Sequence, residues 1–338
     1  MAVVRSVLVV ALCLLGCGKK HEQSGPPPEV TGLAAVPASA EVIIGADVTK
    51  LADSPIVERM IEALMQRDSK LVASWKQVKD GCKIDVVKQV KHITLVLGPT
   101  PAGGRAGTGP ALMIATGQLP ETDLSECVGK LVGKGGGAVT GKPINGRTLY
   151  EVKDGARAMY FAYGRADTVV LGNTEAYVLE AINPGQKATD HPELSAWLKQ
   201  VDQRLPLWAV GRVDERVRKG LVGVLPGLKS GPTAFLGTLD PTDGAKVMLA
   251  AIMASNEDAS SLESFTITQK KVMAMAAQRM SLAKVVNKVS IQTSGSVVYF
   301  RAPLDMADVN QLLSVLDGGG VAKQDAPPSA GSGSAAPQ

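Results

Sequence analysis

The amino-acid sequence predicts an α+β protein made of two similar lobes, each a mainly antiparallel sheet with helices packed on one face. Short apolar runs bounded by turn residues alternate with longer segments whose apolar residues recur at helical spacing. The order strand, helix, hairpin, helix, hairpin recurs in both halves, which favours antiparallel sheets. A chain of 338 residues can also bury two modest cores. We therefore expect lobes at residues 40–185 and 186–317.

The first lobe opens on a buried strand at residues 40–48, and Asp47 at its end is expected to cap a helix. Asp53 or Ser54 can cap the next helix, whose apolar face carries Ile56, Met60, Ile61, Leu64 and Met65. The same signals place the other strands at 90–98, 111–117, 147–152, 157–163 and 168–171, and helices at 121–132 and 175–182.

The second lobe repeats this order. Asp214 can cap a helix, and Asp240-Pro241-Thr242-Asp243-Gly244 is a hairpin signal. The pattern places strands at 205–213, 233–239, 246–253, 285–293 and 297–302, and helices at 214–225, 258–280 and 305–316. Two internal matches, residues 43–61 with 209–225 and residues 114–136 with 300–320, favour a duplicated plan.

The strongest functional signal lies at the N-terminus. Arg5 precedes an apolar run from Val7 to Leu15, which is too short to span a bilayer and is typical of a signal peptide. The run ends in Leu14-Leu15-Gly16-Cys17, which resembles the lipobox of bacterial lipoproteins. The resemblance covers the first seventeen residues and implies acylation of Cys17 and cleavage between Gly16 and Cys17. An ordinary secretory signal with a chance cysteine is the alternative.

A lipoprotein of this kind would be held firmly, because two or more acyl chains anchor a protein stably in a membrane. Gly18 follows the cysteine where an Asp retains many lipoproteins in the inner membrane, so the resemblance favours the outer membrane, with an extracytoplasmic body. Residues 17–39 are rich in Gly, Ser and Pro and are expected to form a flexible tether. Residues 318–338 are expected to be disordered.

Two cysteines remain after Cys13 leaves with the signal peptide and Cys17 is acylated. Cys82, in a predicted loop, and Cys127, in a predicted helix, form an even pair in a compartment that permits disulfides. We expect them to be bonded; two free thiols are the alternative. A metal site is not expected, since no Cys-x-x-Cys and no neighbouring His accompanies them.

No catalytic or cofactor motif emerges from the chain. The stretch from Gly136 to Pro143 imitates a phosphate-binding loop, but Pro143 replaces the hydroxyl residue that would hold Mg²⁺, so we interpret it as a hairpin. His21, His92 and His191 have no ligand spacing, which predicts exposed or edge positions and no metal. We expect no enzyme activity and no cofactor, with a site assembled from distant residues as the alternative.

The expected function is therefore that of a non-enzymatic, membrane-anchored envelope lipoprotein that binds or scaffolds a protein or envelope partner. Carriage or sensing of an apolar ligand is the alternative. The methionines Met60, Met65, Met273, Met275 and Met280 are expected to fill the core, although they could instead line an adaptable groove. Aromatic residues make up only 4% and the charge of +4 is dispersed, which argues against a nucleic-acid partner.

Overall fold

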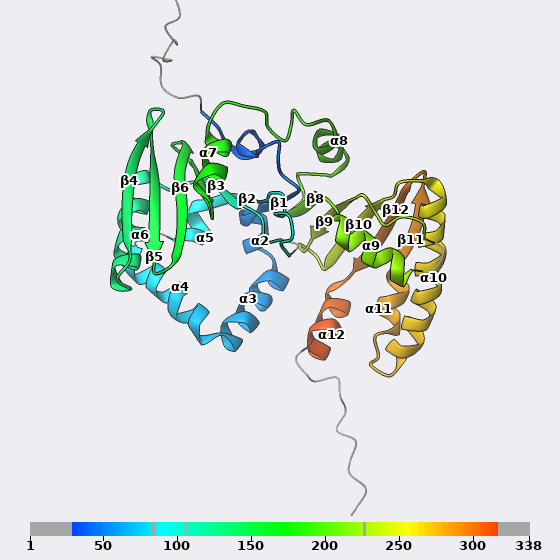
Figure 1. Ribbon diagram of the computed structural model, residues 1–338. Helices are drawn as coiled ribbons and strands as arrows, with labels where there is room; N and C mark the ends of the chain where they lie inside the picture. The colour runs from blue at the N-terminus through cyan, green and yellow to red at the C-terminus, as the bar shows by residue number, and fades with distance from the viewer. Residues whose placement is uncertain (1–28, 83–84, 106, 226–227, 317–338) are drawn as a thin grey trace, which may run out of the picture.

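The computed structural model describes residues 29–82, 85–105, 107–225 and 228–316 (Figure 1). Within them the strands form one twelve-stranded sheet in which every neighbouring pair is antiparallel. The α+β class is therefore confirmed. The order across the sheet is β11-β12-β10-β9-β8-β1-β2-β3-β7-β6-β5-β4.

Most strands follow the apolar runs of the sequence, but the predicted strand at 285–293 is wrong at its start, because residues 283–288 are helical and the strand begins at Ser290. The strands are β1 Val42–Asp47, β2 Val90–Leu97, β3 Ala111–Gly117, β4 Ala138–Ile144, β5 Arg147–Asp154, β6 Arg157–Arg165, β7 Thr168–Gly172, β8 Leu207–Arg212, β9 Ala234–Asp240, β10 Ala245–Ile252, β11 Ser290–Ser294 and β12 Val297–Leu304.

The helices comprise the predicted amphipathic segments and several that the sequence pattern misses. They are η1 Gly32–Ala35, α2 Val48–Ala52, α3 Pro55–Arg67, α4 Ser69–Cys82, α5 Val86–Gln89, α6 Glu121–Lys134, α7 Glu175–Ile182, α8 Pro192–Gln200, α9 Glu215–Val224, α10 Asn256–Gln278, α11 Ala283–Lys288 and α12 Met306–Leu316.

The two halves of the chain meet at the centre of the sheet, where β1 pairs with β8 from Val42↔Gly211 to Ala46↔Leu207. On one side the order outward is β1-β2-β3-β7-β6, continued by β5 and β4; on the other it is β8-β9-β10-β12-β11. Hydrogen bonding therefore continues from one half into the other.

Helices cover both faces of the sheet, so the prediction of helices on one face is wrong. One face, which includes Ile43, Ile114 and Val210, is buried with residues of η1, α7 and α8. The opposite face is buried against α6 at one end and against α10 at the other. Strand alternation explains this, because successive side chains point to opposite faces and both sets are apolar here.

The predicted tether ends earlier than residue 39. Ala35 and Val36 are fully buried, the Val30 amide donates to the Gly164 carbonyl oxygen at 3.1 Å, and Pro37 forms a bridge with Lys187. Residues 30–37 therefore belong to the folded body, because buried apolar side chains and satisfied amides fix them there. Cys17 and residues 318–338 lie outside the described residues.

Candidate functional site

A single row of side chains crosses the whole sheet on the face that α6 and α10 cover at its ends. Residues paired in register share a face, so the row can be followed from strand to strand. It runs through Gly141, Tyr150, Phe161, Leu171, Met113, Leu95, Ile44, Ala209, Gly237, Leu249, Phe300 and Ile291. The row contains no charged side chain.

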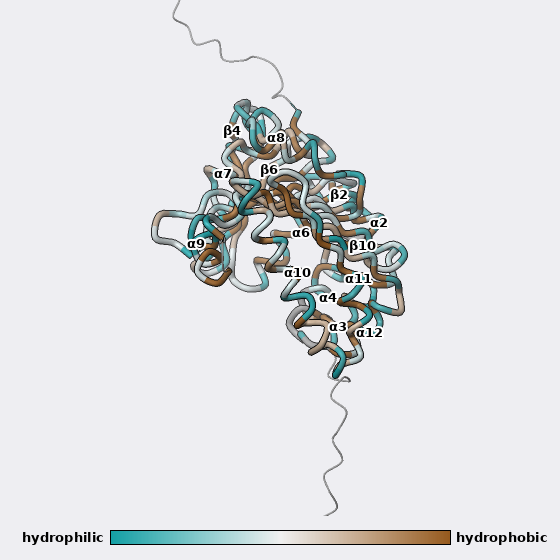
Figure 2. Tube along the Cα trace, turned by 90° about the vertical axis from the view of Figure 1, so that its right-hand side faces the viewer, coloured by the Kyte–Doolittle hydropathy of each residue, from teal (hydrophilic) through white to brown (hydrophobic). Residues whose placement is uncertain are grey.

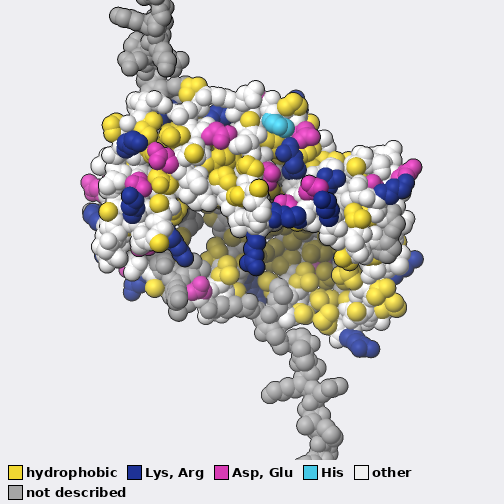
Figure 3. All heavy atoms as spheres, viewed as in Figure 1, with side chains coloured by type: hydrophobic (Ala, Val, Ile, Leu, Met, Phe, Trp, Pro, Cys, Tyr) yellow, Lys and Arg dark blue, Asp and Glu magenta, His cyan; other side chains and the backbone are white. Residues whose placement is uncertain are grey.

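Two large apolar side chains near the middle of this row are exposed, whereas those beneath α6 and α10 are packed. Phe161 is 2% exposed beneath α6, whereas Leu95 is 42% and Leu249 is 51% exposed. Between these leucines lie Ile44 and Ala209, which are half-buried, and Gly237, which is buried, so the leucines supply the exposed apolar area there. Figure 3 shows a hollow below the edge of the sheet with hydrophobic side chains inside it. We call this surface the concave face.

Helix α3 stands beside the concave face with its apolar stripe largely unburied. Ser54 accepts a hydrogen bond from the Val57 amide and Pro55 occupies the first turn, which fixes where the helix begins. Ile56 is 6% exposed, but Met60, Ile61 and Leu64 each exceed 50%. The remaining predicted apolar position, Met65, is half-buried. The prediction that Met60 fills the core is therefore wrong, and on this apolar face Ile56 in the first turn is the buried residue.

Helices α9 and α10, which lie to the right of α3 in Figure 1 and are also labelled in Figure 2, leave apolar side chains exposed as well. Val217 and Val224 of α9 are exposed, as are Met273, Met275 and Met280 in and just after the last turns of α10. The expectation that these methionines fill the core is therefore wrong. Large exposed apolar areas rimmed by polar residues are typical of binding surfaces.

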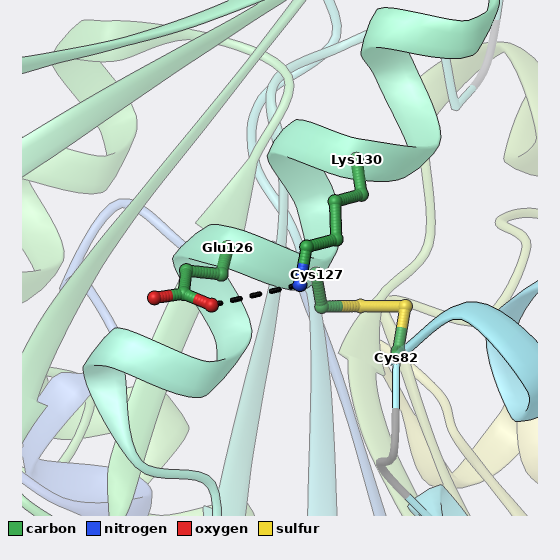
Figure 4. The surroundings of a disulfide bond; sticks show 4 residues. All are labelled: Cys82, Glu126, Cys127 and Lys130. Carbon is green, nitrogen blue, oxygen red and sulfur yellow. Dashed lines mark ion pairs between the residues drawn. A yellow bond between two sulfur atoms is a disulfide. The ribbon is translucent and has the colours of Figure 1, made fainter.

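The predicted disulfide is present between Cys82, the last residue of α4, and Cys127 in the middle of α6 (Figure 4). The two Cα atoms are 4.7 Å apart and both side chains are buried. Cys82 ends a helix, so its predicted loop position is corrected. The ion pair between Glu126 and Lys130, at 3.6 Å, lies on the exposed side of α6. The bond fixes the α3–α4 arm to the helix that covers one end of the sheet.

The predicted capping residues occupy those roles. Asp47 accepts a hydrogen bond from the Lys50 amide at 3.1 Å, and Asp214 accepts one from the Arg216 amide at 2.8 Å. Burial raises the pKa of Asp47, but hydrogen bonds from Lys50 and the nearby His92 outweigh that effect and hold the pKa below its ordinary value. Both carboxylates are therefore charged at neutral pH, as helix N-termini favour.

The two described histidines are separated. His92 is exposed at the start of β2, and His191 accepts a weak hydrogen bond from the Leu194 amide as the cap of α8. His191 thus begins a helix in a segment we predict as a loop. In the described part of the chain, no group of His, Cys, Asp and Glu is arranged to hold a metal ion. None of the helices described there is long and apolar enough to span a membrane.

Comparison with known proteins shows no matching family model and no matching curated protein. Among solved structures, the protein is similar to one described as "Structure of crystal form I of TP0453". The two share 12% identity with a TM-score of 0.48, over 88% of this chain and 99% of the other. A similarity of this size assigns neither a family nor a function.

Proposed function

We propose that the protein is a non-enzymatic lipoprotein of the cell envelope, and that its concave face binds an apolar ligand or partner. In this proposal the signal peptide ends at Gly16, Cys17 carries the lipid, and the anchored body lies outside the cytoplasm, with the outer membrane favoured by Gly18. The disulfide between Cys82 and Cys127 supports an oxidising compartment, because disulfides rarely persist in a reducing cytosol.

The exposure of the concave face is the observation that carries the binding proposal. Leu95 and Leu249 on the floor, and Met60, Ile61 and Leu64 on α3, all leave more than two fifths of their surface in water. Each of these side chains is about half exposed, so it gains about 0.7–1.5 kcal/mol when an apolar ligand covers the rest of it, which is half the value for burying a fully exposed side chain. A few covered side chains therefore supply the affinity, and methionine adapts its shape to ligands that differ.

The matching strand order of the two halves supports a second part of the proposal, that the protein is a duplicated pair of lobes. In both halves the first three strands lie in sequence order and are followed outward by the last strand of that half. In this reading β1 corresponds to β8, and the floor of the concave face lies where the two copies join. A ligand on the floor would thus contact both copies.

Binding of a fluorescent fatty acid, cis-parinaric acid, to the mature chain tests the ligand hypothesis. We expect saturable binding that Leu249→Gln weakens about tenfold, because a polar amide replaces an apolar contact. Met159→Gln is the matched control, since Met159 is also 51% exposed but lies on β6, which β3 and β7 separate from β2. Equal binding by both variants, or none by the native protein with no co-purified lipid in native mass spectrometry, would contradict the hypothesis.

A protein partner is the second candidate occupant, because α3 offers an apolar helix face of the kind that docks into grooves. Cross-linking from a residue replaced at Leu64 in intact membranes tests it. The control places the same cross-linker at Glu62, on the polar side of α3. A protein that is captured repeatedly from position 64 but not from position 62 would support this candidate. Capture from both positions alike would contradict it, and so would capture from neither.

A further inference from the structure

A second recess lies on the other face of the sheet, separate from the concave face. It is a pocket of about 650 Å³ at the edge where β1 and β3 end and β2 begins. Gly45, Thr94 and Thr116 form its floor, and η1 and the Trp208 indole form walls. A Cβ at position 45 would lie 2.2 Å from the Trp208 ring, so glycine is what lets the indole lie flat there. The volume is that of a typical small-ligand site.

Basic side chains from separate elements converge on this pocket. Lys50 comes from α2, Lys91 and His92 from β2, Arg165 from the end of β6, and Arg204 from the segment before β8.

Three of these cations are held in place by interactions at the pocket rim. The Lys50 ammonium donates to the Arg204 carbonyl oxygen at 2.7 Å and lies 3.2 Å from the Asp47 carboxylate. Arg165 donates through Nε and Nη2 to Asp167, with both distances 2.6 Å. These bonds fix one side of the Arg165 guanidinium and leave its Nη1 group outside the pair.

Arg204 is held in the same way by Asp202, with Nε and Nη2 at 2.9 and 3.0 Å from the carboxylate oxygens. The lining includes two lysines, two arginines and the two carboxylates Asp47 and Asp167. Asp202, which pairs with Arg204, does not line the pocket, so cations outnumber carboxylates in the lining by four to two. Arginine forks and lysine ammonium groups at such a surface are suited to an anion with several oxygens.

We propose that this pocket binds a phosphate group. A phosphate accepts hydrogen bonds on several sides at once, which suits donors that arrive from α2, β2, β6 and the 202–204 turn. The phosphate can belong to a soluble phosphomonoester or to a phospholipid headgroup. The headgroup arm rests on the proposed function, because Thr31 at the pocket wall follows Cys17 by fourteen residues. That length of chain reaches at most about 50 Å, which keeps the pocket within reach of the membrane surface.

The test uses the mature chain, residues 17–338, with Cys17→Ser so that no lipid anchor contributes. Calorimetry measures the affinity for inorganic phosphate and for glycerol 3-phosphate, and sedimentation measures binding to phosphatidylglycerol vesicles. The double variant Lys91→Gln, Arg204→Gln removes two exposed pocket cations, and we expect at least about tenfold weaker binding. Arg157→Gln, Lys199→Gln is the control, because it removes the same charge from exposed residues outside the pocket.

Each result decides the proposal. If only the pocket variant loses binding to soluble phosphate, the proposal is supported and the ligand is a soluble phosphate. If only the pocket variant loses binding to vesicles, the proposal is supported and the ligand is a phospholipid headgroup. No binding by the native chain in either assay overturns it, as does an equal loss in pocket and control variants. Since the pocket and the concave face lie on opposite faces of the sheet, loss of parinaric acid binding leaves this proposal standing, and the reverse also holds.

Discussion

Removing the disulfide between Cys82 and Cys127 is the perturbation whose size the structure determines best. The bond joins residues 45 apart in sequence. Closing a loop of that length lowers the entropy of the unfolded chain by an amount worth about 4 kcal/mol at 25 °C. Alanine is the suitable replacement because both sulfur atoms lie among buried apolar side chains, where a serine hydroxyl would lack a partner. We expect Cys82→Ala, Cys127→Ala to lower the free energy of unfolding by about 4 kcal/mol.

Urea denaturation followed by tryptophan fluorescence measures this loss. Trp197 and Trp208 are buried and report on the body, while Trp75 on α4 is 42% exposed and reports on the arm that the disulfide holds. The native protein treated with a reductant should match the double variant. A change below about 1 kcal/mol in both preparations would refute the entropic reasoning. If removing the bond changed only the unfolding transition that Trp75 reports, and left that of Trp197 and Trp208 unchanged, the bond would stabilise only the α3–α4 arm.

Three further predictions concern single side chains in the packed body. Asp258→Asn should cost about 2–3 kcal/mol, because that buried carboxylate accepts hydrogen bonds from the 229–230 loop and from the Ser255 hydroxyl, and an amide can accept with one atom only. Burial raises the pKa of Asp258, but those hydrogen bonds outweigh the effect of burial and hold the pKa below its ordinary value. The native protein should therefore lose stability as the pH falls through that lowered pKa. The variant should lack this loss at acid pH in urea titrations. Gly45→Ala should lower the melting temperature through its clash with Trp208, an overpacking worth about 1–3 kcal/mol, and an unchanged melting temperature would disprove the close contact. Gly129→Ala, in α6 with open space around it, should stabilise by about 0.5–1 kcal/mol in the same assay, and destabilisation would show that the position is crowded.

Strong local signals were enough to predict most elements, and residues 111–117 and 175–182 have the predicted bounds. The missed elements have weak or misleading signals. Helix α8 begins at Pro192, which suits the first turn of a helix but also marks loops, and its cap is a histidine. Strand β4 contains Gly141 and Pro143, and it forms only because it is an edge strand paired on one side with β5. The second internal match, residues 114–136 with 300–320, aligns β3 with β12, which hold different places in the two halves.

Among the candidate sites, too, some could be predicted from the sequence and others could not. The disulfide could be predicted because two cysteines remained and the compartment permits the bond. The basic pocket could not, since its residues come from six segments between Thr31 and Trp208 that only the strand pairing brings together. Nor could the concave face, because alternation places apolar side chains on both faces of these strands and says nothing of which face a helix covers.

Helices α3 and α6 differ in what their apolar faces pack against. Both carry apolar residues at helical spacing, and Met60 of α3 was expected to lie in the core. In α6 the stripe that includes Leu124 and Val128 packs against the cluster of Phe161 and Tyr163, whereas Ile61 and Leu64 of α3 remain over 50% exposed. The spacing identifies the face that avoids water but not what it packs against. Because exposed apolar area costs about 25 cal/mol per Å² relative to burial, a stripe that the fold itself leaves open favours a partner from outside the chain. Replacing apolar by polar residues on the exposed face of α3 should therefore cost binding and spare stability.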